Sequence, residues 1–490
     1  METSDNSGAP GLVRGLGLWA AIAVVMGSTI GTAIFLVPSE MARELGSGAW
    51  VLAVWLVGGV VVLFGTFCYA ELGAAMPEAG GDYVYLSRGL GSVWGFLFGW
   101  MTVLIQRPAS AATITAGLLR LAGFIFPSLN APIFTWRIPA PFRTHSYQFT
   151  FTAAQSWAVA AIAAMAIINY FGVRSAGRVQ TVLTGLKVAA MVSIVVLGLT
   201  VGKLNGIHPQ LVATSSPSGG VGAFLTALVP VMFAYNGFSA LGMVGGEIVA
   251  PKRNIPRAAI LGVMGVVGLY TAIDLVYFRV LGFSQVAQSQ HVASDVFALL
   301  AGGSGGKWFT VVMMVAALGT LHANFLTGPR VSYAMARNGQ FFKFAERIQP
   351  AFHTPSGALI FQGCIAAILV LTGTFEELYS LNTFAIWTFF LLTAVALIRL
   401  RRKEPTLHRP YRVWGYPWTP LLFGIAAFAM TTNLWLVRPV RCSIGLAVIL
   451  LGLPFFYHWR KRASCSVWPR SPSSRRAMPR APRPTSRSKI

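Results

Sequence analysis

The sequence has few charged residues and very few acidic ones. Only 11% of its 490 residues are charged, and only 14 are Asp or Glu, whereas a soluble domain carries about 25% charged residues. More than half of the chain, 55%, is hydrophobic. This composition excludes an ordinary soluble globule and indicates a protein that lies in a lipid bilayer.

Cysteine and the residues that carry catalysis are scarce as well. The four cysteines, Cys68, Cys364, Cys442 and Cys465, are scattered without the spacing of a metal site, and so are the seven histidines. The apolar segments contain no HExxH, no GxSxG and no pair of carboxylates. We therefore expect no metal, no cofactor and no enzymatic activity.

Long apolar runs make up most of the chain. Each has about 20 residues or more, the length that crosses a bilayer as a helix. They cover roughly residues 17–37, 48–74, 91–126, 153–171, 178–201, 221–247, 257–282, 308–336, 356–374, 378–399, 415–435 and 442–459. The predicted fold class is an all-α membrane protein with 12 transmembrane helices, the first retained rather than cleaved as a signal peptide.

The net charge of +24 is unevenly placed. Most basic loop residues fall in the even-numbered connections, which by the positive-inside rule places these loops and both termini in the cytoplasm. Residues 460–490 form a basic Pro/Ser/Arg tail without an acidic residue, which we expect to be disordered and cytoplasmic rather than to bind nucleic acid.

Two of the apolar runs contain residues that weaken a helix at mid-membrane. The first run has the sequence Gly27-Ser28-Thr29-Ile30-Gly31 at its centre, and the sixth has Phe233-Ala234-Tyr235-Asn236-Gly237. Glycine destabilises a helix by about 1 kcal/mol, and Ser and Thr compete for backbone hydrogen bonds. Interrupted helices at matching places in the two halves of a chain indicate a transporter built from inverted repeats.

Broken helices suit an amino acid substrate. The N-terminus of a half-helix offers free N–H groups to a carboxylate, and the C-terminus of a half-helix offers carbonyls to an ammonium. Small residues at one such place usually permit close helix packing instead. Two breaks five helices apart favour a substrate site.

Seven motifs follow one another along the chain, namely "GSTIGTAIFLVPS", "YAELGAAMPEAGGDYVYL", "LIQRPAS", "NYFGVRSAGRVQTVLTGLK", "FAYNGFSALGMVGGEIVAPKRNIPRA", "NFLTGPRVSYAMARNGQF" and "HTPSGALIFQ". In this order they resemble the amino acid–polyamine–organocation (APC) superfamily, and within it the L-type amino acid transporter group. The resemblance covers roughly residues 11–460.

The resemblance implies a LeuT-type fold with discontinuous first and sixth helices. Its units would be a cytoplasmic N-terminus (1–16), a first five-helix repeat (17–201), a second repeat (221–399), two appended helices (415–459) and the tail (460–490). It also implies sodium-independent amino acid transport in the cell (inner) membrane, usually by exchange. The loop between the third and fourth spans has no cysteine, so no disulfide-linked heavy chain is expected as a partner.

The resemblance also implies the binding residues. Ser28, Thr29, Ile30 and Gly31 would hold the substrate carboxylate and part of its amine. The amine site would be completed from the sixth span by Phe233, Ala234 and Asn236. Phe233 would also be the gating aromatic on the extracellular side, and the rest of the pocket would come from the third, eighth and tenth spans, with residues such as Asn324 and Ile386.

Lys187 lies within the fifth span, where an ammonium group is expensive and marks a functional site by default. The resemblance places it beside the first break, in the position of a sodium ion in sodium-driven relatives, tethering the fifth span to carbonyls near Gly27. A proton carrier and a lysine that snorkels to the interface are the alternatives.

Other charged residues admit two readings each. Glu247, at the end of the sixth span, is a candidate inner-gate ion pair, with Arg174, Arg178 or Arg337, or else an ordinary helix-end salt bridge. For the intramembrane residues Arg107, Asp274 and Arg279, pairing with neighbours or reaching the interface is the favoured interpretation. His322 is expected to have a hydrogen-bonded structural role.

The predicted function is an exchanger (antiporter) of neutral L-amino acids that works by alternating access. A neutral substrate is favoured because no carboxylate is evident among the pocket positions. The alternative is a proton-coupled amino acid symporter that uses Lys187, and a membrane sensor or an enzyme is more distant.

Overall fold

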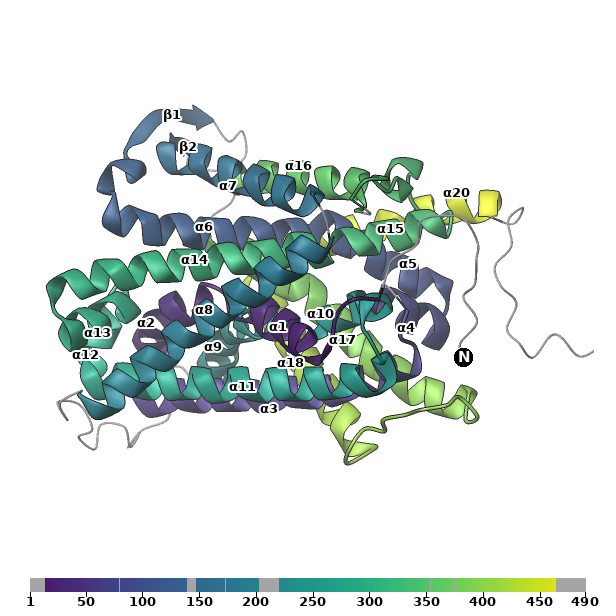
Figure 1. Cartoon of the computed structure of the whole chain (residues 1–490), viewed down its shortest axis with the longest axis horizontal. Coiled ribbons are helices and arrows are strands. Elements are labelled where there is room, and N and C mark those ends of the chain that lie inside the picture. Colours follow the sequence, from purple (N-terminus) through teal and green to yellow (C-terminus); the bar gives the residue numbers. More distant parts are fainter. Residues whose placement is uncertain are drawn as a thin grey trace, which may run out of the picture.

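The computed structural model is built almost entirely of helices (Figure 1). It describes residues 14–78, 80–138, 147–171, 173–201, 220–352, 354–372 and 375–463. The predicted N-terminal unit and basic tail therefore lie largely outside the described residues. The α-helices are α1 (Leu18–Thr29), α2 (Ala33–Leu45), α3 (Gly48–Ala75), α4 (Asp82–Gly89), α5 (Ser92–Met101), α6 (Arg107–Ile125), α7 (Ala153–Tyr170), α8 (Val173–Thr200), α9 (Gly220–Ala234), α10 (Ala240–Met243), α11 (Pro251–Val280), α12 (Phe283–Gln288), α13 (Val292–Ala301), α14 (Gly303–Thr327), α15 (Pro329–Arg337), α16 (Ser356–Thr372), α17 (Phe375–Lys403), α18 (Trp418–Val437), α19 (Pro439–Leu450) and α20 (Gly452–Ala463).

The described residues contain 10 helices, or up to 11 with the bent pair α9–α10, that are long and apolar enough to cross a membrane. The ninth of the predicted spans is present as a shorter apolar helix, Ser356–Leu371. The chain is therefore an all-helical membrane protein.

The long helices run roughly parallel to one another along the molecule (Figure 1). Helices α3 and α11 pack along each other on one side, and α6 packs with α14 and α16 on the other. The shorter helices α1 and α10 lie between these two groups. The broken spans are thus enclosed by the longer helices, and α1 packs against α8, α11 and α14.

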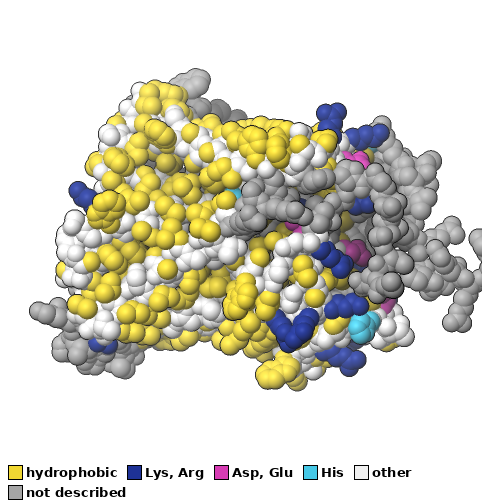
Figure 2. All heavy atoms as spheres, viewed as in Figure 1, with side chains coloured by type: hydrophobic (Ala, Val, Ile, Leu, Met, Phe, Trp, Pro, Cys, Tyr) yellow, Lys and Arg dark blue, Asp and Glu magenta, His cyan; other side chains and the backbone are white. Residues whose placement is uncertain are grey.

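The outer surface matches a lipid environment. Large apolar side chains project from the middle of the long helices, such as Val182 on α8 (69% exposed) and Ile368 on α16 (61%). The visible face has a wide band of hydrophobic atoms, and most Lys and Arg side chains gather toward one end of the molecule (Figure 2). Exposed apolar surface of this extent is stable only against hydrocarbon.

The first break separates α1 from α2 at residues 30–32. Ile30 is extended (φ −72°, ψ 98°) and ends α1, and Thr32 is the N-cap residue of α2. The helix axis is interrupted where the sequence places two glycines and two hydroxyl residues in succession, Gly27 to Gly31.

The second break ends α9 at Ala234. A short 3-10 helix, Asn236–Ser239, leads into α10, and the two parts of the span are bent by 45°. Gly237 lies directly against the first break, since a Cβ atom built on it would be 2.3 Å from the Thr29 backbone nitrogen. Only glycine allows this backbone-to-backbone approach.

Two features outside the spans were not predicted. The connection between α6 and α7 contains an antiparallel hairpin of β1 (Pro132–Ile138) and β2 (Tyr147–Thr152). Near the N-terminus, Leu16 forms a parallel bridge with Ile248, just after the second broken span. This bridge ties the start of the chain to the end of the sixth span.

Candidate substrate-binding site

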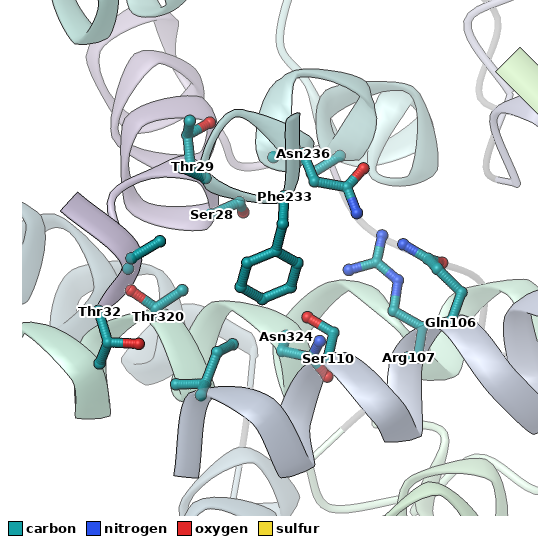
Figure 3. Close-up of a pocket in the computed structure, with 16 residues that line it drawn as sticks. Ser28, Thr29, Thr32, Gln106, Arg107, Ser110, Phe233, Asn236, Thr320 and Asn324 are labelled. Atoms are coloured by element: carbon teal, nitrogen blue, oxygen red, sulfur yellow. The ribbon is translucent and has the colours of Figure 1, made fainter. Parts of the chain in front are cut away.

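A cavity of about 40 Å³ lies where the two breaks meet. About 10–15 Å³ of such space is enough for one water molecule, so the cavity holds a small polar group or several waters. Its walls come from the first break, the second break, α6 and α14 (Figure 3). They comprise Ser28, Thr29, Gly31, Thr32, Ala33, Gln106, Arg107, Ser110, Ile114, Phe233, Ala234, Asn236, Gly237, Ala240, Thr320 and Asn324.

The first break supplies a wall of small and hydroxyl residues. Thr29 donates its hydroxyl to the Val25 carbonyl at 2.7 Å. Gly31 lines the cavity, and a Cβ atom there would have no neighbour closer than 3.7 Å. Beyond it begins α2, whose first N–H groups have no partner within the helix. This wall can therefore accept hydrogen bonds at the carbonyls that end α1 and donate them from the first N–H groups of α2.

Lys187 of α8 binds the backbone of the first break and does not line the cavity. Its Nζ donates to the carbonyls of Gly27 (2.9 Å) and Ile30 (3.0 Å) and lies 3.0 Å from Thr320 Oγ1. The side chain is 1% exposed, so it does not snorkel to the interface. The ammonium thus satisfies carbonyls that the break leaves without helical partners.

Tyr270 of α11 connects the two breaks. Its hydroxyl lies 3.1 Å from the Thr29 carbonyl and 3.4 Å from the Ala234 carbonyl. One hydroxyl hydrogen therefore serves the last residue of α1 and the last residue of α9. The ring is fully buried and packs edge-on against Trp55.

The second break supplies Phe233, Ala234 and Asn236. The Phe233 ring packs against Tyr379, with centroids 5.9 Å apart. Tyr379 in turn lines a second cavity of about 50 Å³, together with Glu40, Glu44 and Arg438. The two aromatic rings thus separate the central cavity from this second one.

The third wall of the cavity is the start of α6, where a π-helix passes into an α-helix. Thr102–Gln106 forms a π-helix between α5 and α6, and the Arg107 amide donates to the Thr102 carbonyl. Pro108, which has no N–H group, follows at once. Such π segments occur frequently at functional sites, and here both Gln106 and Arg107 line the cavity.

The fourth wall is the C-terminal part of α14. Thr320 donates its hydroxyl to the Ile30 carbonyl. Asn324 accepts a hydrogen bond at its Oδ1 from Gln362 at 2.7 Å, which fixes its orientation. His322 points away from the cavity lining and pairs its Nδ1 with Gln180 at 2.9 Å, in line with the structural role expected for it.

Polar groups without partners gather in this cavity. Five side-chain atoms of residues that line it have no hydrogen-bond partner among the described residues, namely Ser28 Oγ, Thr32 Oγ1, Gln106 Oε1, Arg107 Nε and Asn236 Oδ1. Buried polar groups are normally satisfied, so their concentration at one place is the chemical signature of a binding site. Figure 3 shows the Asn236 side chain directed toward Arg107 and Gln106.

Glu247 lies outside this cavity, at the end of the sixth span. It forms a buried ion pair with Arg330 of α15 (Nε to Oε1, 2.6 Å), and the two side chains are 2% and 3% exposed. Its carbonyl accepts the amides of Gly15 and Leu16 at 2.9 and 3.0 Å. From the sequence, Arg174, Arg178 or Arg337 was the candidate partner. The first two side chains are outside the described residues, and Arg330 was missed because a buried arginine at the end of an apolar span does not reveal its partner.

The predicted substrate-binding residues lie together. Ser28, Thr29, Gly31, Phe233, Ala234 and Asn236 all line the cavity. Ile30 does not line it, since its side chain is fully buried and its carbonyl is held by Lys187 and Thr320. Asn324 lines the cavity as predicted, whereas Ile386 is buried elsewhere in α17.

The remaining intramembrane charges differ in their surroundings. Asp274 is fully buried and neither of its carboxyl oxygens has a hydrogen-bond partner. Arg279 reaches the Leu199 carbonyl at 3.5 Å, so the two residues do not form an ion pair with each other. No group of three His, Cys, Asp or Glu side chains suitable for a metal occurs in the described parts of the chain.

Comparisons with known proteins show the family of the chain. A sequence model of the amino acid permease family matches residues 16–453. The chain is 30% identical to the serine/threonine exchanger SteT of Bacillus subtilis over 466 residues, which cover 94% of this chain and 99% of that protein. It is 30% identical to the Asc-type amino acid transporter 1 of Mus musculus (93% and 83% covered) and 29% identical to the large neutral amino acids transporter small subunit 2 of the same species (95% and 85% covered). The chain therefore belongs to the amino acid permease family of the APC superfamily.

Proposed function

We propose that this protein is a sodium-independent exchanger of neutral L-amino acids that works by alternating access. The observation that carries the proposal is the meeting of two interrupted helices, backbone against backbone, around a cavity with unpartnered polar groups. The relatives named above are a serine/threonine exchanger, an Asc-type amino acid transporter and a large neutral amino acids transporter, and the first and third of these names support the same substrate class.

The substrate's main chain would bind at the breaks. Its carboxylate would accept from the Ser28 hydroxyl and from the free N–H groups at the start of α2. Its ammonium would donate to the carbonyls at the end of α9, near Phe233 and Ala234, and to Asn236 Oδ1. Thr29, Ile30 and Gly31 would shape this site through their backbone.

Lys187 would replace a coupling cation. Its ammonium is fixed by three oxygens at the first break, in a place where half-helix carbonyls would otherwise attract a metal cation. A permanent internal charge there supports independence from sodium. Lys187 as a proton carrier, and hence proton-coupled symport, is the second candidate, favoured by the same burial of an amine.

A neutral substrate is supported by the charges around the cavity. None of the lining residues is acidic, and the charged one is Arg107. A lysine or arginine side chain would therefore enter the cavity without a counter-ion. Such a buried, unpaired charge is strongly unfavourable.

Two contacts would serve as gates. The Phe233 and Tyr379 rings separate the central cavity from the second cavity, and we assign them to the extracellular side. The Glu247–Arg330 pair closes the opposite side, where the N-terminal segment also attaches. Opening one contact while the other stays closed is what alternating access requires.

We also propose the finer architecture. The chain would have twelve spans, arranged as two inverted five-helix repeats of the LeuT type, residues 17–201 and 221–399, with two appended helices. Both termini would lie in the cytoplasm, and the protein would reside in the cell membrane. It would act without a disulfide-linked heavy chain and without enzymatic activity.

Transport by purified protein in liposomes tests this proposal. We expect uptake of labelled alanine or serine only into vesicles preloaded with a neutral amino acid, with no change when sodium is replaced by potassium. Uptake into empty vesicles driven by an inward proton gradient would support the symporter instead. No uptake of any neutral amino acid under either condition would refute both.

A further inference from the structure

We propose that Arg107, together with Gln106, forms the subsite for the substrate's side chain and selects side chains that carry an oxygen hydrogen-bond acceptor. This inference rests on the proposed function, because it assumes that an amino acid occupies the cavity. It adds a residue that determines which amino acids fit.

The guanidinium of Arg107 is buried and lacks a carboxylate partner. The residue is 6% exposed. One Nη donates to Thr327 Oγ1 at 3.0 Å and the other contacts the Met243 sulfur. Asp82 is close enough to act on its charge, but among the described residues no acidic side chain lies within 4.0 Å of it.

The guanidinium therefore retains capacity to donate. Arginine has five N–H donors, and Nε has no partner in the protein. Neighbouring Gln106 has an unpartnered Oε1 and is 3% exposed. Both side chains line the cavity and point toward Asn236, across from the hydroxyl wall of Ser28 and Thr29 (Figure 3).

The position of this pair suits a side chain rather than the main chain of the substrate. The unwound segments provide groups for both ends of a zwitterion, whereas Gln106 and Arg107 belong to a different helix on another wall. Their local geometry is set by the π-helix and Pro108, which direct two successive polar residues to one cavity.

A site built to hydrogen-bond a ligand rejects an analogue that lacks the partner, because its own polar groups are then left unpaired. A hydroxyl, carboxamide or carboxylate oxygen would accept from Arg107, and a hydroxyl or amide hydrogen would donate to Gln106 Oε1. A methyl group can do neither, and a cationic side chain would be repelled.

The direct test compares serine with 2-aminobutyrate, which has a methyl group in place of the hydroxyl. In counterflow with the wild-type protein, we expect serine to be preferred by about tenfold or more. Preference for asparagine over 2-aminobutyrate would support the same subsite, with a carboxamide oxygen as the acceptor. Transport of 2-aminobutyrate that equals or exceeds that of serine would overturn the inference while leaving the proposed function intact.

Variants locate the preference at Arg107. We expect Arg107→Met to bring the ratio of serine to 2-aminobutyrate transport close to one, and Arg107→Lys to retain part of it. Arg88→Gln, which removes an exposed arginine paired with Glu404, is the matched control and should leave the ratio unchanged. If Arg107→Met lowers both rates by the same factor, Arg107 only supports the fold through Thr327. If Arg107→Met is inactive, Arg107→Lys is the test, and a ratio of serine to 2-aminobutyrate transport equal to that of the wild type would overturn the role of Arg107.

Discussion

At the scale of single residues, Lys187 makes three buried hydrogen bonds around the first break. One ammonium group contacts α1, the first break and α14, through Gly27, Ile30 and Thr320. A break in a transmembrane helix leaves carbonyls that lipid cannot satisfy. Lys187 therefore satisfies two carbonyls at the first break, beside the hydrogen bonds from Thr320 and Tyr270.

Removing this ammonium should impair transport. We expect Lys187→Met to reduce exchange at least tenfold and to lower the melting temperature, because leaving buried polar groups unpaired costs about 1–3 kcal/mol. Counterflow and thermal unfolding in detergent measure the two effects. Lys252→Met, which changes an exposed lysine of α11, is the control. Normal exchange by Lys187→Met would contradict the tether.

Gly237 makes the second residue-scale prediction. A Cβ atom at this position would be 2.3 Å from the Thr29 nitrogen and 2.4 Å from the Ser28 carbonyl carbon, so Gly237→Ala must push the two breaks apart. We expect this variant to insert in the membrane but to lose amino acid binding, measured by counterflow. Gly268→Ala, on α11 with nothing within 4 Å, should behave as the wild type. Unchanged binding by Gly237→Ala would mean that the breaks need not touch.

Many of the residues that line the cavity could be predicted from the sequence, because their residue types are unusual for the run of sequence in which they stand. Gly31, Ser28 and Asn236 stand out because helix-breaking or polar residues are unusual inside apolar runs. Thr320 and Gln106 were missed because a single polar residue on a helix does not reveal which neighbour it faces. Thr320 can even bond its own helix, at 3.2 Å to the Ala316 carbonyl, as threonine in membrane helices often does.

At the scale of elements, buried ionic contacts hold the ends of the spans. The Glu247–Arg330 pair joins the sixth span to α15. Asp82 at the start of α4 accepts hydrogen bonds from Tyr69 of α3 and from Thr393 of α17. Each links segments that are far apart in the sequence, which explains why neither pairing was predicted.

The Glu247–Arg330 pair should be energetically coupled. Removing one partner of a buried ion pair typically costs about 3–5 kcal/mol, because the other charge is left unpaired. We expect Glu247→Gln and Arg330→Gln each to lower thermal stability strongly, and the double variant to lose less than the sum. The exposed pair Arg88–Glu404, 40% and 27% exposed, should show coupling of at most about 1 kcal/mol. Additive losses at Glu247 and Arg330 would refute the coupling.

Asp82 makes a prediction about pH. Burial raises the pKa of Asp82 to about 6, from an ordinary value of 3.8, against the opposing effect of the hydrogen bonds from Tyr69 and Thr393. Because the folded state holds the proton more tightly, this group stabilises the fold below about pH 4, and the contribution is lost as the pH rises through about 6. The melting temperature of the wild type relative to Asp82→Asn should therefore fall between pH 4 and pH 7. A constant difference would contradict this assignment.

Element boundaries were predicted less well than element identity. The apolar runs gave the long helices, since hydrocarbon thickness fixes their length. The π-helix at Thr102–Gln106 and the hairpin of β1 and β2 were not predicted. Both depend on how backbone groups find partners after folding, which residue composition alone does not specify.

At the scale of the whole molecule, the two interrupted spans form the centre of the helical bundle. The long helices such as α3, α6, α11 and α14 surround the two interrupted spans. The interrupted spans contact each other through backbone, Tyr270 and Lys187. Because these contacts join the two interrupted spans, we expect a displacement of one span to move the other.

The central claim is that the two breaks bind both ends of a zwitterion. The most direct measurement is competition by analogues of alanine against labelled alanine in counterflow. The account predicts that alanine competes, whereas propionate, which lacks the amine, and ethylamine, which lacks the carboxylate, fail at a hundredfold higher concentration. Competition by propionate or ethylamine at the same concentration as alanine would show that one end suffices and would contradict the account.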